Sequence, residues 1–327
     1  MRRLVIRHGP IECAYEAGPC AYTLYRKLIA AGIRCIVVAP SRLPAVKGRV
    51  KNDHRDAMTL ARLLRSGDLV AVWVPDPVHE AMRDLVRARQ AASWDVRKAR
   101  QRIQSYLLLR DRHYVGKSWS RQHRLWIAAQ QFEHPTQQIT LQGYVNALEQ
   151  AESRRADLDA QIAEILPAWA LAPTVTALQA LRGIATIIAV TLVAEVRDFS
   201  RFASARDLMA YLGLVPGEHS SGTTVRSRGI TKQGNSAIRA LLYEAAWCYR
   251  QGAKVGQWMK THIPDSVPQC ARDIAWKAQL RLCARYRHLV ARGKKSQVAI
   301  TAVARKLLGF AWAIAMRIPT PIVANRG

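Results

Sequence analysis

Acidic residues are scarce in this sequence, and several familiar motifs are missing. Only 23 of the 327 residues are Asp or Glu, against 50 Lys or Arg. The six cysteines form no Cys-x-x-Cys pair, which excludes zinc ribbons and dithiol redox motifs, and no Gly-x-x-x-x-Gly-Lys-Ser/Thr loop is present to bind nucleoside triphosphates. No apolar run approaches the roughly 20 residues that span a bilayer. We therefore expect a reduced, cytoplasmic protein without a membrane partner.

The charge that remains is strongly positive. The formal net charge is +27, and no acid follows Asp273. With 50% hydrophobic residues the chain is also too apolar to be disordered. A folded chain of this charge is typical of proteins that bind a polyanion, most often nucleic acid.

The N-terminal part alternates between strand and helix patterns. Strands are predicted at Ile11–Tyr15, Arg34–Ala39 and Val70–Val74, with helices at Ala21–Ala31 and Asp53–Ser66 between them. Asn52 or Asp53 would cap the second helix, and Gly67 would end it. Strands separated by helices indicate an α/β fold with a parallel sheet.

The rest of the chain is predicted to be mostly helical. A helix is expected over 78–112, a less regular stretch over 119–135, and a polar loop over 216–233. Heptad spacing predicts a long helix that ends near Pro167, either in a coiled coil or packed on its own domain. The heptad positions are Leu141, Tyr144, Leu148, Ala151, Arg155, Leu158, Ile162 and Ile165. Around Gly183 the chain reads as helical from Leu178 to Val196, like a helix-hairpin-helix element that could present amides to a phosphate.

Three acids are candidates for metal chemistry. Glu16 follows a predicted strand, at the sheet edge where sites form in α/β folds, and Asp53 and Asp56 share one face of a helix. Together they could hold divalent metal ions for phosphodiester chemistry. The alternative is structural, with Asp53 as a helix cap and Asp56 paired to a nearby arginine.

A second candidate is the loop at 213–235. It combines glycines, a Ser-Ser-Gly-Thr-Thr run and the cations Arg226, Arg228 and Lys232. A serine here could attack a phosphate that the cations stabilise, with His219 as a possible activating group. The alternative is a basic loop that contacts a nucleic-acid backbone without chemistry.

Ordered blocks along the chain resemble one family, the bridge-RNA-guided DEDD transposases of the insertion-sequence 110 family. The N-terminal blocks are AYEAGPCAYTLYRKL (14–28), VVAPSRLP (37–44), VKNDHRDAMTLARLLRSGDL (50–69) and VWVPD (72–76). The C-terminal blocks are LQALRGI (178–184), DFSRFASARDLMAYLGLVPGEHSSG (198–222), GITKQGNSAIRALLYEAAW (229–247) and YRHLVARGKKSQVAITAVARKLLGFAWAI (286–314).

This resemblance implies a fold and a mechanism. It implies an RNase-H-like (RuvC-like) domain over 1–115, a linker and coiled-coil helix over 116–170, and a mostly helical serine transposase domain over 171–327. Glu16, Asp53 and Asp56 match three of the family's four acids, which would hold two Mg²⁺ ions. Ser221, with Ser220 as the alternative, matches a nucleophile that forms a 5′-phosphoserine link to DNA before strand exchange.

The resemblance also implies partners. These are donor DNA, target DNA, a structured bridge RNA and further copies of the chain, as a dimer to tetramer. The residues expected to contact nucleic acid are Arg42, Lys47, Arg49, Arg226, Arg228, Lys232 and Arg239.

One departure from the family pattern bears on activity. The family's first Asp lies on an initial strand, but the fifteen residues before Glu16 contain no Asp and look like the tail of a helix. We therefore expect an N-terminally truncated copy with an incomplete sheet, or a start placed too late. The alternative functions are a metal-dependent nuclease of the Holliday-junction type and a nucleic-acid-binding remnant that does not cut.

Overall fold

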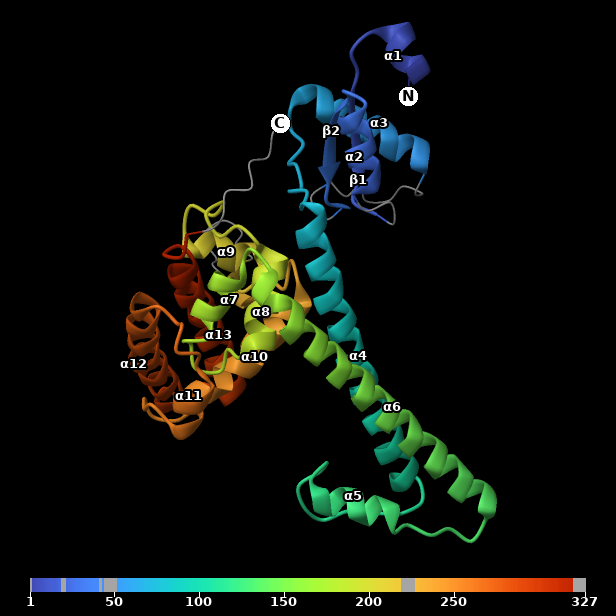
Figure 1. Cartoon of the computed structure of the whole chain (residues 1–327), viewed down its shortest axis with the longest axis vertical. Coiled ribbons are helices and arrows are strands. Elements are labelled where there is room, and N and C mark those ends of the chain that lie inside the picture. The colour runs from blue at the N-terminus through green and yellow to red at the C-terminus, as the bar shows by residue number, and fades with distance from the viewer. Residues whose placement is uncertain (1, 19–21, 41–42, 44–51, 219–226, 320–327) are drawn as a thin grey trace. The chain divides into compact units, whose positions relative to one another are not determined.

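The computed structural model describes the whole chain except residues 1, 19–21, 41–42, 44–51, 219–226 and 320–327 (Figure 1). It forms two compact units, residues 1–77 and 78–327. Helices dominate, and strands are few and short. These units are defined by compactness, whereas the three segments expected from the resemblance (1–115, 116–170 and 171–327) are defined by function. The functional segments therefore stay a prediction.

A two-stranded parallel sheet forms the centre of the first unit. Strand β1 (Glu12–Glu16) pairs with β2 (Arg34–Val38), so that Glu16 lies opposite Val38. Helix α2 (Thr23–Ala30) makes the crossover, as the alternation of strand and helix patterns predicted. Leu28, Ile33 and Cys35 are buried together, and burial raises the pKa of the Cys35 thiol.

Two helices flank this sheet in the sequence. Helix α1 (Arg2–His8) confirms that the residues before β1 are helical. Helix α3 (Asp53–Ser66) has the predicted bounds and ends at Gly67. Its cap is Asn52, whose side chain accepts the backbone N–H of His54 at 2.9 Å. Asp53 is therefore not the cap.

The prediction of a third strand at Val70–Val74 is wrong. Among the described residues, this segment makes one isolated antiparallel bridge, between Ala71 and Val38. The Val72 N–H also donates to the carbonyl of Val37 at 2.7 Å. Pro75 and Pro77 lack an N–H to donate, so the pairing is not extended beyond Val74.

A long helical hairpin begins the second unit. Helix α4 (Pro77–Leu108) and helix α6 (Pro135–Ile165) run antiparallel (Figure 1). Arg89 pairs with Asp159, Arg100 pairs with Glu152, and the Tyr106 hydroxyl donates to the carbonyl of Gln137. Helix α5 (Arg121–Ala128) packs at the tip through Ile127, so the stretch expected to be irregular contains a helix.

The heptad pattern of α6 is largely accounted for within the chain. Leu141, Leu148 and Ile162 are buried, and Tyr144 packs against the core at the hairpin tip. The pattern is wrong at its end, because Ile165 is 49% exposed while Leu166 is buried. Leu166 begins the short 3₁₀ helix η2 (Leu166–Ala168), which changes the direction of the chain.

The remaining helices pack into one apolar core. Their bounds are α7 (Ala172–Leu178), α8 (Thr186–Val196), α9 (Ala205–Tyr211), α10 (Ser236–Ala246), η3 (Trp247–Arg250), α11 (Gln257–His262), α12 (Gln269–Ala291) and α13 (Ser296–Ala315). The turn expected around Gly183 between two helices is confirmed, but the first helix, α7, ends at Leu178, where the helical segment was predicted to begin, so residues 179–185 are not helical.

Helix α13 is the centre of this core and packs against α7, α9, α10 and α12. In the described part of the chain it is also long and apolar enough to cross a membrane, which corrects the expectation that no such run exists. Its apolar side chains face neighbouring helices: Val303, Leu307, Leu308 and Ile314 are fully buried. An apolar helix of this kind is ordinary in a protein core.

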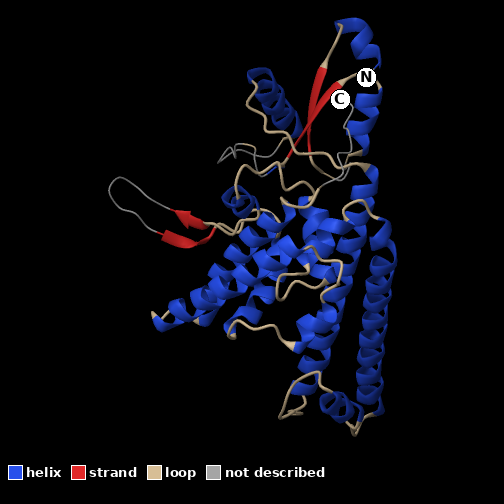
Figure 2. Ribbon diagram, turned by 60° about the vertical axis from the view of Figure 1, so that its left-hand side comes forward, coloured by secondary structure: helices blue, strands red, loops and turns tan. Residues whose placement is uncertain are grey.

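A β-hairpin replaces the polar loop expected over 216–233. Strands β3 (Pro216–Glu218) and β4 (Ser227–Ile230) pair antiparallel, with Pro216 opposite Ile230. Figure 2 shows this hairpin, in red, leaving the side of the helical core.

Candidate functional site

The three candidate acids lie on neighbouring elements of the first unit. Glu16 is the last residue of β1 and is half-buried, and the next N–H, that of Ala17, donates to the carbonyl of Val38. Asp53 and Asp56 lie in the first turn of α3, which packs against β1. Asp56 is half-buried and Asp53 is exposed. The acids are thus at the carboxyl edge of the sheet and on the adjoining helix.

The structure does not gather these acids into a metal site. Among the described residues, no three Asp, Glu, His or Cys side chains lie close enough together to hold an ion. His54 is exposed beside Asp53, and its backbone N–H belongs to the Asn52 cap. The metal-binding role of Glu16, Asp53 and Asp56 therefore stays a prediction.

The candidate serines belong to the hairpin of the second unit. Ser220, Ser221, His219 and Arg226 lie outside the described residues, between Glu218 of β3 and Ser227 of β4. Arg42, Lys47 and Arg49 also lie outside them. Of the remaining predicted contacts, Arg228 is in β4 and Lys232 is exposed just beyond it.

The base of the hairpin is held by backbone contacts between two turns. The N–H of Thr231 donates to the carbonyl of Val215 at 2.9 Å, and that of Lys232 donates to the carbonyl of Gly213 at 3.1 Å. These bonds join the segment that enters the hairpin to the segment that leaves it. They fix the two ends of the loop that carries the serines.

Two glycines make this contact possible. Gly213 (φ 67°) and Gly234 (φ 72°) have left-handed backbone conformations, which glycine adopts readily. A Cβ on Gly213 would lie 2.0 Å from the carbonyl oxygen of Gln233, and one on Gly234 would lie 2.2 Å from that of Tyr211. The two turns are therefore in backbone contact, with no room for a side chain between them.

Arg239 completes this base. Its Nη1 donates to the carbonyls of Leu212 at 3.1 Å, Gln233 at 2.6 Å and Gly234 at 3.1 Å. Burial lowers the pKa of the Arg239 guanidinium. From the sequence, Arg239 was expected to contact nucleic acid; the structure shows that it ties the two turns together, and any phosphate contact stays a prediction.

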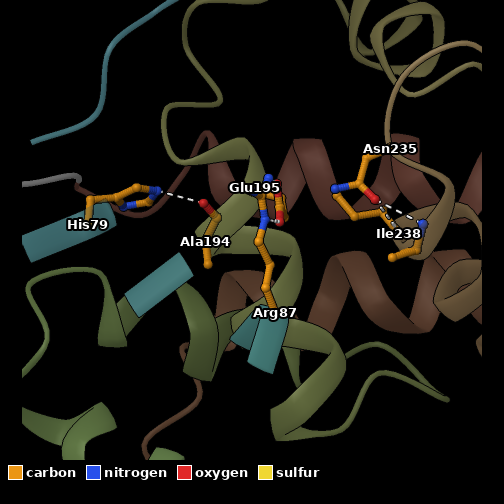
Figure 3. A network of polar contacts seen from close by, with 7 residues as sticks. His79, Arg87, Ala194, Glu195, Asn235 and Ile238 are labelled. Carbon is orange, nitrogen blue, oxygen red and sulfur yellow. Dashed lines mark hydrogen bonds and ion pairs between the residues drawn. The ribbon is translucent and has the colours of Figure 1, made fainter. Parts of the chain in front are cut away.

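Asn235 places the helix that follows the hairpin. Its side-chain oxygen accepts the N–H groups of Ala237 and Ile238, which caps α10 (Figure 3). The run Gly234-Asn235 thus joins the hairpin base directly to a buried helix. Asn is a preferred residue at this position, because its side-chain oxygen can accept N–H groups that the first turn of a helix leaves without a partner.

Two polar contacts connect the α4–α6 helical hairpin to the helical core. His79 Nε2 lies 2.6 Å from the carbonyl oxygen of Ala194, and Arg87 makes a two-pronged ion pair with Glu195 at 2.7 and 2.9 Å (Figure 3). Both contacts join α4 to α8. The sequence gave no sign of this pairing, since the partners lie more than 100 residues apart.

Sequence reasoning marked the acid-free segment after Asp273 as basic, but it missed that several of these cations gather around one pocket of the core. Arg206 of α9 lies close to Arg305 and Lys306 of α13, although about 100 residues separate them. Arg281 and Arg285 of α12 line the adjoining pocket. The available signals were the lack of acids after Asp273 and the i, i+4 spacing of the α12 arginines, which places them on one helix face.

Comparison with known proteins gives matches over most of the chain. Residues 175–262 match a family model described as "Transposase IS116/IS110/IS902 family", and residues 6–110 match a second model described as "Transposase". A Sinorhizobium fredii protein named as a transposase, y4qE, is 50% identical over 96% of this chain and 78% of its own length. The transposase for insertion sequence element IS1533 of Leptospira borgpetersenii is 30% identical over 90% of this chain and 86% of its own. That for IS1328 of Yersinia enterocolitica is 27% identical over 82% and 83%, respectively.

Proposed function

Because the chain belongs to the IS116/IS110/IS902 family of transposases, we propose that it cuts and rejoins DNA with a serine of the β3–β4 hairpin as nucleophile. Ser221, directly before Gly222, is the proposed residue, and Ser220 is its neighbour in the same loop. The observation that carries this proposal is the fixed base of the hairpin. A nucleophile must be presented in a defined geometry, and here both ends of its loop are tied to buried helices.

The proposed chemistry needs no external energy source. The serine oxygen forms a bond to phosphorus as the bond from phosphorus to the 3′ oxygen breaks. The hydroxyl proton passes to that leaving oxygen, directly or through water, and gives a free 3′-hydroxyl. The protein remains joined to the DNA by a 5′-phosphoserine. Since the number of phosphoester bonds is unchanged, a second 3′-hydroxyl can attack the link and reverse the reaction on a new strand.

Cations beside the loop would stabilise the reacting phosphate. The attacked phosphorus gains negative charge as it becomes five-coordinate, and positive groups fixed nearby lower that barrier. Arg226, Arg228 and Lys232 follow the serines in the sequence, and Lys232 is exposed at the hairpin base. We propose that these three residues bind the DNA phosphates at the cleavage point.

The acids of the first unit have the chemistry that Mg²⁺ prefers. Glu16, Asp53 and Asp56 offer carboxylate oxygens, the usual ligands of this ion. The described residues do not bring three such groups together, so no step of the reaction is derived through a metal. We propose only that Mg²⁺ is the ion these acids would take.

The proposed partners are donor and target DNA, a structured bridge RNA from the same element, and other copies of this chain. The net charge of +27 supports nucleic-acid binding, because phosphate contacts dominate such affinity. A surface for self-association is offered by the tip of the α4–α6 hairpin. Leu109, Val115 and Ile139 are 82%, 96% and 70% exposed there. Exposed apolar side chains in one region are typical of protein interfaces.

A covalent adduct tests the proposed function. The full chain would be mixed with labelled DNA bearing the element's ends, Mg²⁺ and RNA transcribed from the element, and then run on a denaturing protein gel. We expect a labelled band at the size of the protein plus its attached DNA strand, lost in Ser221→Ala and retained in Ser220→Ala.

The same assay separates the alternatives. Glu16→Gln and Asp53→Asn serve as comparisons, because a metal-dependent nuclease would release free DNA ends that need these acids and not the serine. A labelled adduct that survives removal of both serines would sink the assignment of the nucleophile. Binding with neither adduct nor cleavage would identify a non-cutting remnant.

A further inference from the structure

Five cationic side chains surround connected pockets of the helical core. One pocket, of about 610 Å³, lies between α9, α12 and α13 and is lined by Arg281, Arg285, Arg305 and Lys306. A second shares Arg305 and Lys306 with it and adds Arg206. In the part of the chain that the structure describes, none of the five forms an ion pair with an acid.

These cations repel one another. The pKa of Arg305 is lowered by burial and then by the positive charges of Arg285 and Arg206. An acid also lines the second pocket, Asp207, but its carboxylate accepts both the N–H and the hydroxyl of Ser204 at the start of α9 and forms no ion pair with these cations among the described residues. A bound anion would relieve this crowding, so the pocket is suited to a phosphate.

The floor of the pocket is apolar and includes an aromatic ring. Met209, Leu282, Phe310 and Ala313 line it together with the cations. Phe310 is half-buried, and the guanidinium of Arg281 lies 5.8 Å from the centre of its ring. A free phosphate would make no favourable contact with these apolar side chains. A nucleotide would, because its base can stack on an aromatic ring while cations bind its phosphate.

The pocket adjoins the hairpin that carries the serines. The second pocket, of about 880 Å³, is lined by Val215, Pro216 and Gly217 at the start of β3 as well as by Arg305 and Lys306. The first pocket therefore adjoins the base of the hairpin through the residues that the two pockets share. Both volumes lie in the range of roughly 300–1,000 Å³ typical of small-ligand sites.

We propose that the pocket between α9, α12 and α13 holds one unpaired nucleotide of the DNA strand beside the cleavage point. Its base lies on Phe310, and its phosphate lies between Arg285 and Arg305. This inference rests on the proposed function for the identity of the strand. It adds a requirement for local unpairing, since a base inside a duplex cannot reach the pocket floor.

Binding without cleavage tests this inference. The probe is a fluorescent single-stranded DNA of about 12 nucleotides, within the usual site sizes for single strands. It is compared with an abasic strand, a duplex and an RNA of matching length, all in EDTA so that metal-dependent cleavage does not occur. The variants of the full chain are Phe310→Leu, Phe310→Tyr and the double variant R285Q/R305Q. The matched control is R287Q/K295Q, which removes two exposed cations outside the pocket.

The expected results differ between the variants. Phe310→Leu should weaken binding of single-stranded DNA about fivefold or more without affecting the abasic strand, and Phe310→Tyr should restore it. R285Q/R305Q should weaken both strands about tenfold and reduce the salt slope by about 1.4 more than the control does. Thermal unfolding of each variant checks that the core is intact.

Three outcomes would overturn the proposal: pocket variants that behave like the control, a Phe310→Leu effect that is equal with and without bases, or preferential binding of duplex or RNA. Because the strand is never cut here, this result is separate from the adduct assay. Failure of the serine assignment leaves the pocket measurement intact, and the reverse also holds.

Discussion

Removing the guanidinium of Arg239 should loosen the hairpin base without touching the loop that carries the serines. Arg239→Gln leaves the carbonyls of Leu212, Gln233 and Gly234 without their donor. A hydrogen bond to a charged group contributes about 1.5–3 kcal/mol to stability. The three bonds share one nitrogen and the residue is only half-buried, so we expect a loss of about 2–3 kcal/mol in the free energy of unfolding rather than the full sum.

Two measurements separate this structural role from a phosphate contact. Urea unfolding gives the free energy, and amide hydrogen exchange at Thr231 and Lys232 reports on the base itself, since both N–H groups bond across it. Exchange at these two amides should accelerate more than exchange in α12. Lys260→Gln is the control, because Lys260 is an exposed cation on α11.

The opposite pattern would refute this reasoning. If Arg239→Gln unfolds like the wild type and instead weakens DNA binding with a smaller salt slope, Arg239 is a nucleic-acid contact and its carbonyl bonds are incidental. Arg239→Lys adds a second comparison. It keeps the charge but reaches fewer acceptors, so it should rescue DNA binding in the second case and not stability in the first.

Two further predictions follow from the same kind of contact. Gly234→Ala should destabilise the second unit by about 2–4 kcal/mol in urea unfolding, because the new Cβ would lie 2.2 Å from the carbonyl oxygen of Tyr211. The control is Gly252→Ala, where a Cβ would meet nothing within 4 Å and stability should change little. Equal losses of stability in the two variants would contradict the argument. At the tip of the α4–α6 helical hairpin, burial and then the charge of Arg124 lower the pKa of His123. The Nδ1 of His123 accepts the N–H of Trp119 at 2.8 Å. The folded state therefore holds His123 neutral, so its contribution to stability is present above the ordinary pKa of about 6.5 and is lost as the pH falls below it. Tryptophan fluorescence should report this change, and an unchanged profile in His123→Phe would refute it.

Local patterns in the sequence predicted most of the elements but not their contacts. Helix α3 and strand β2 follow from the cap at Asn52 and the apolar run Cys35–Val38, both of which depend on neighbouring residues. The strand expected at Val70–Val74 failed because a strand needs a continuous ladder as well as a suitable composition, and among the described residues this segment makes only a single bridge to Val38. The β3–β4 hairpin was missed for the opposite reason, since its Gly- and Ser-containing sequence is poor in strand-forming residues.

The same contrast between local patterns and long-range contacts applies to the site residues. Glu16 could be placed at the end of a strand because it directly follows the strand predicted at Ile11–Tyr15. The role of Arg239 could not be read from the sequence, since its acceptors are backbone carbonyls that every residue carries. The basic pocket also stayed hidden, because it joins α9 to α12 and α13 across about 100 residues.

The scarcity of acids decides which arginines are available to nucleic acid. In the described part of the second unit, Arg87, Arg89, Arg100, Arg124 and Arg154 each pair with a carboxylate, and each of these pairs involves α4, α5 or α6. These arginines hold the α4–α6 helical hairpin together, and Arg87 also joins it to α8. No acid follows Asp273, which lies near the start of α12, so the later part of α12 and all of α13 carry cations without any carboxylate. A basic side chain whose charge is not neutralised inside the fold is the kind that releases counterions on binding phosphate. The same positive charge therefore has two uses in one chain: it holds the helices together where acids are present, and where they are absent it leaves a surface that only a polyanion can neutralise.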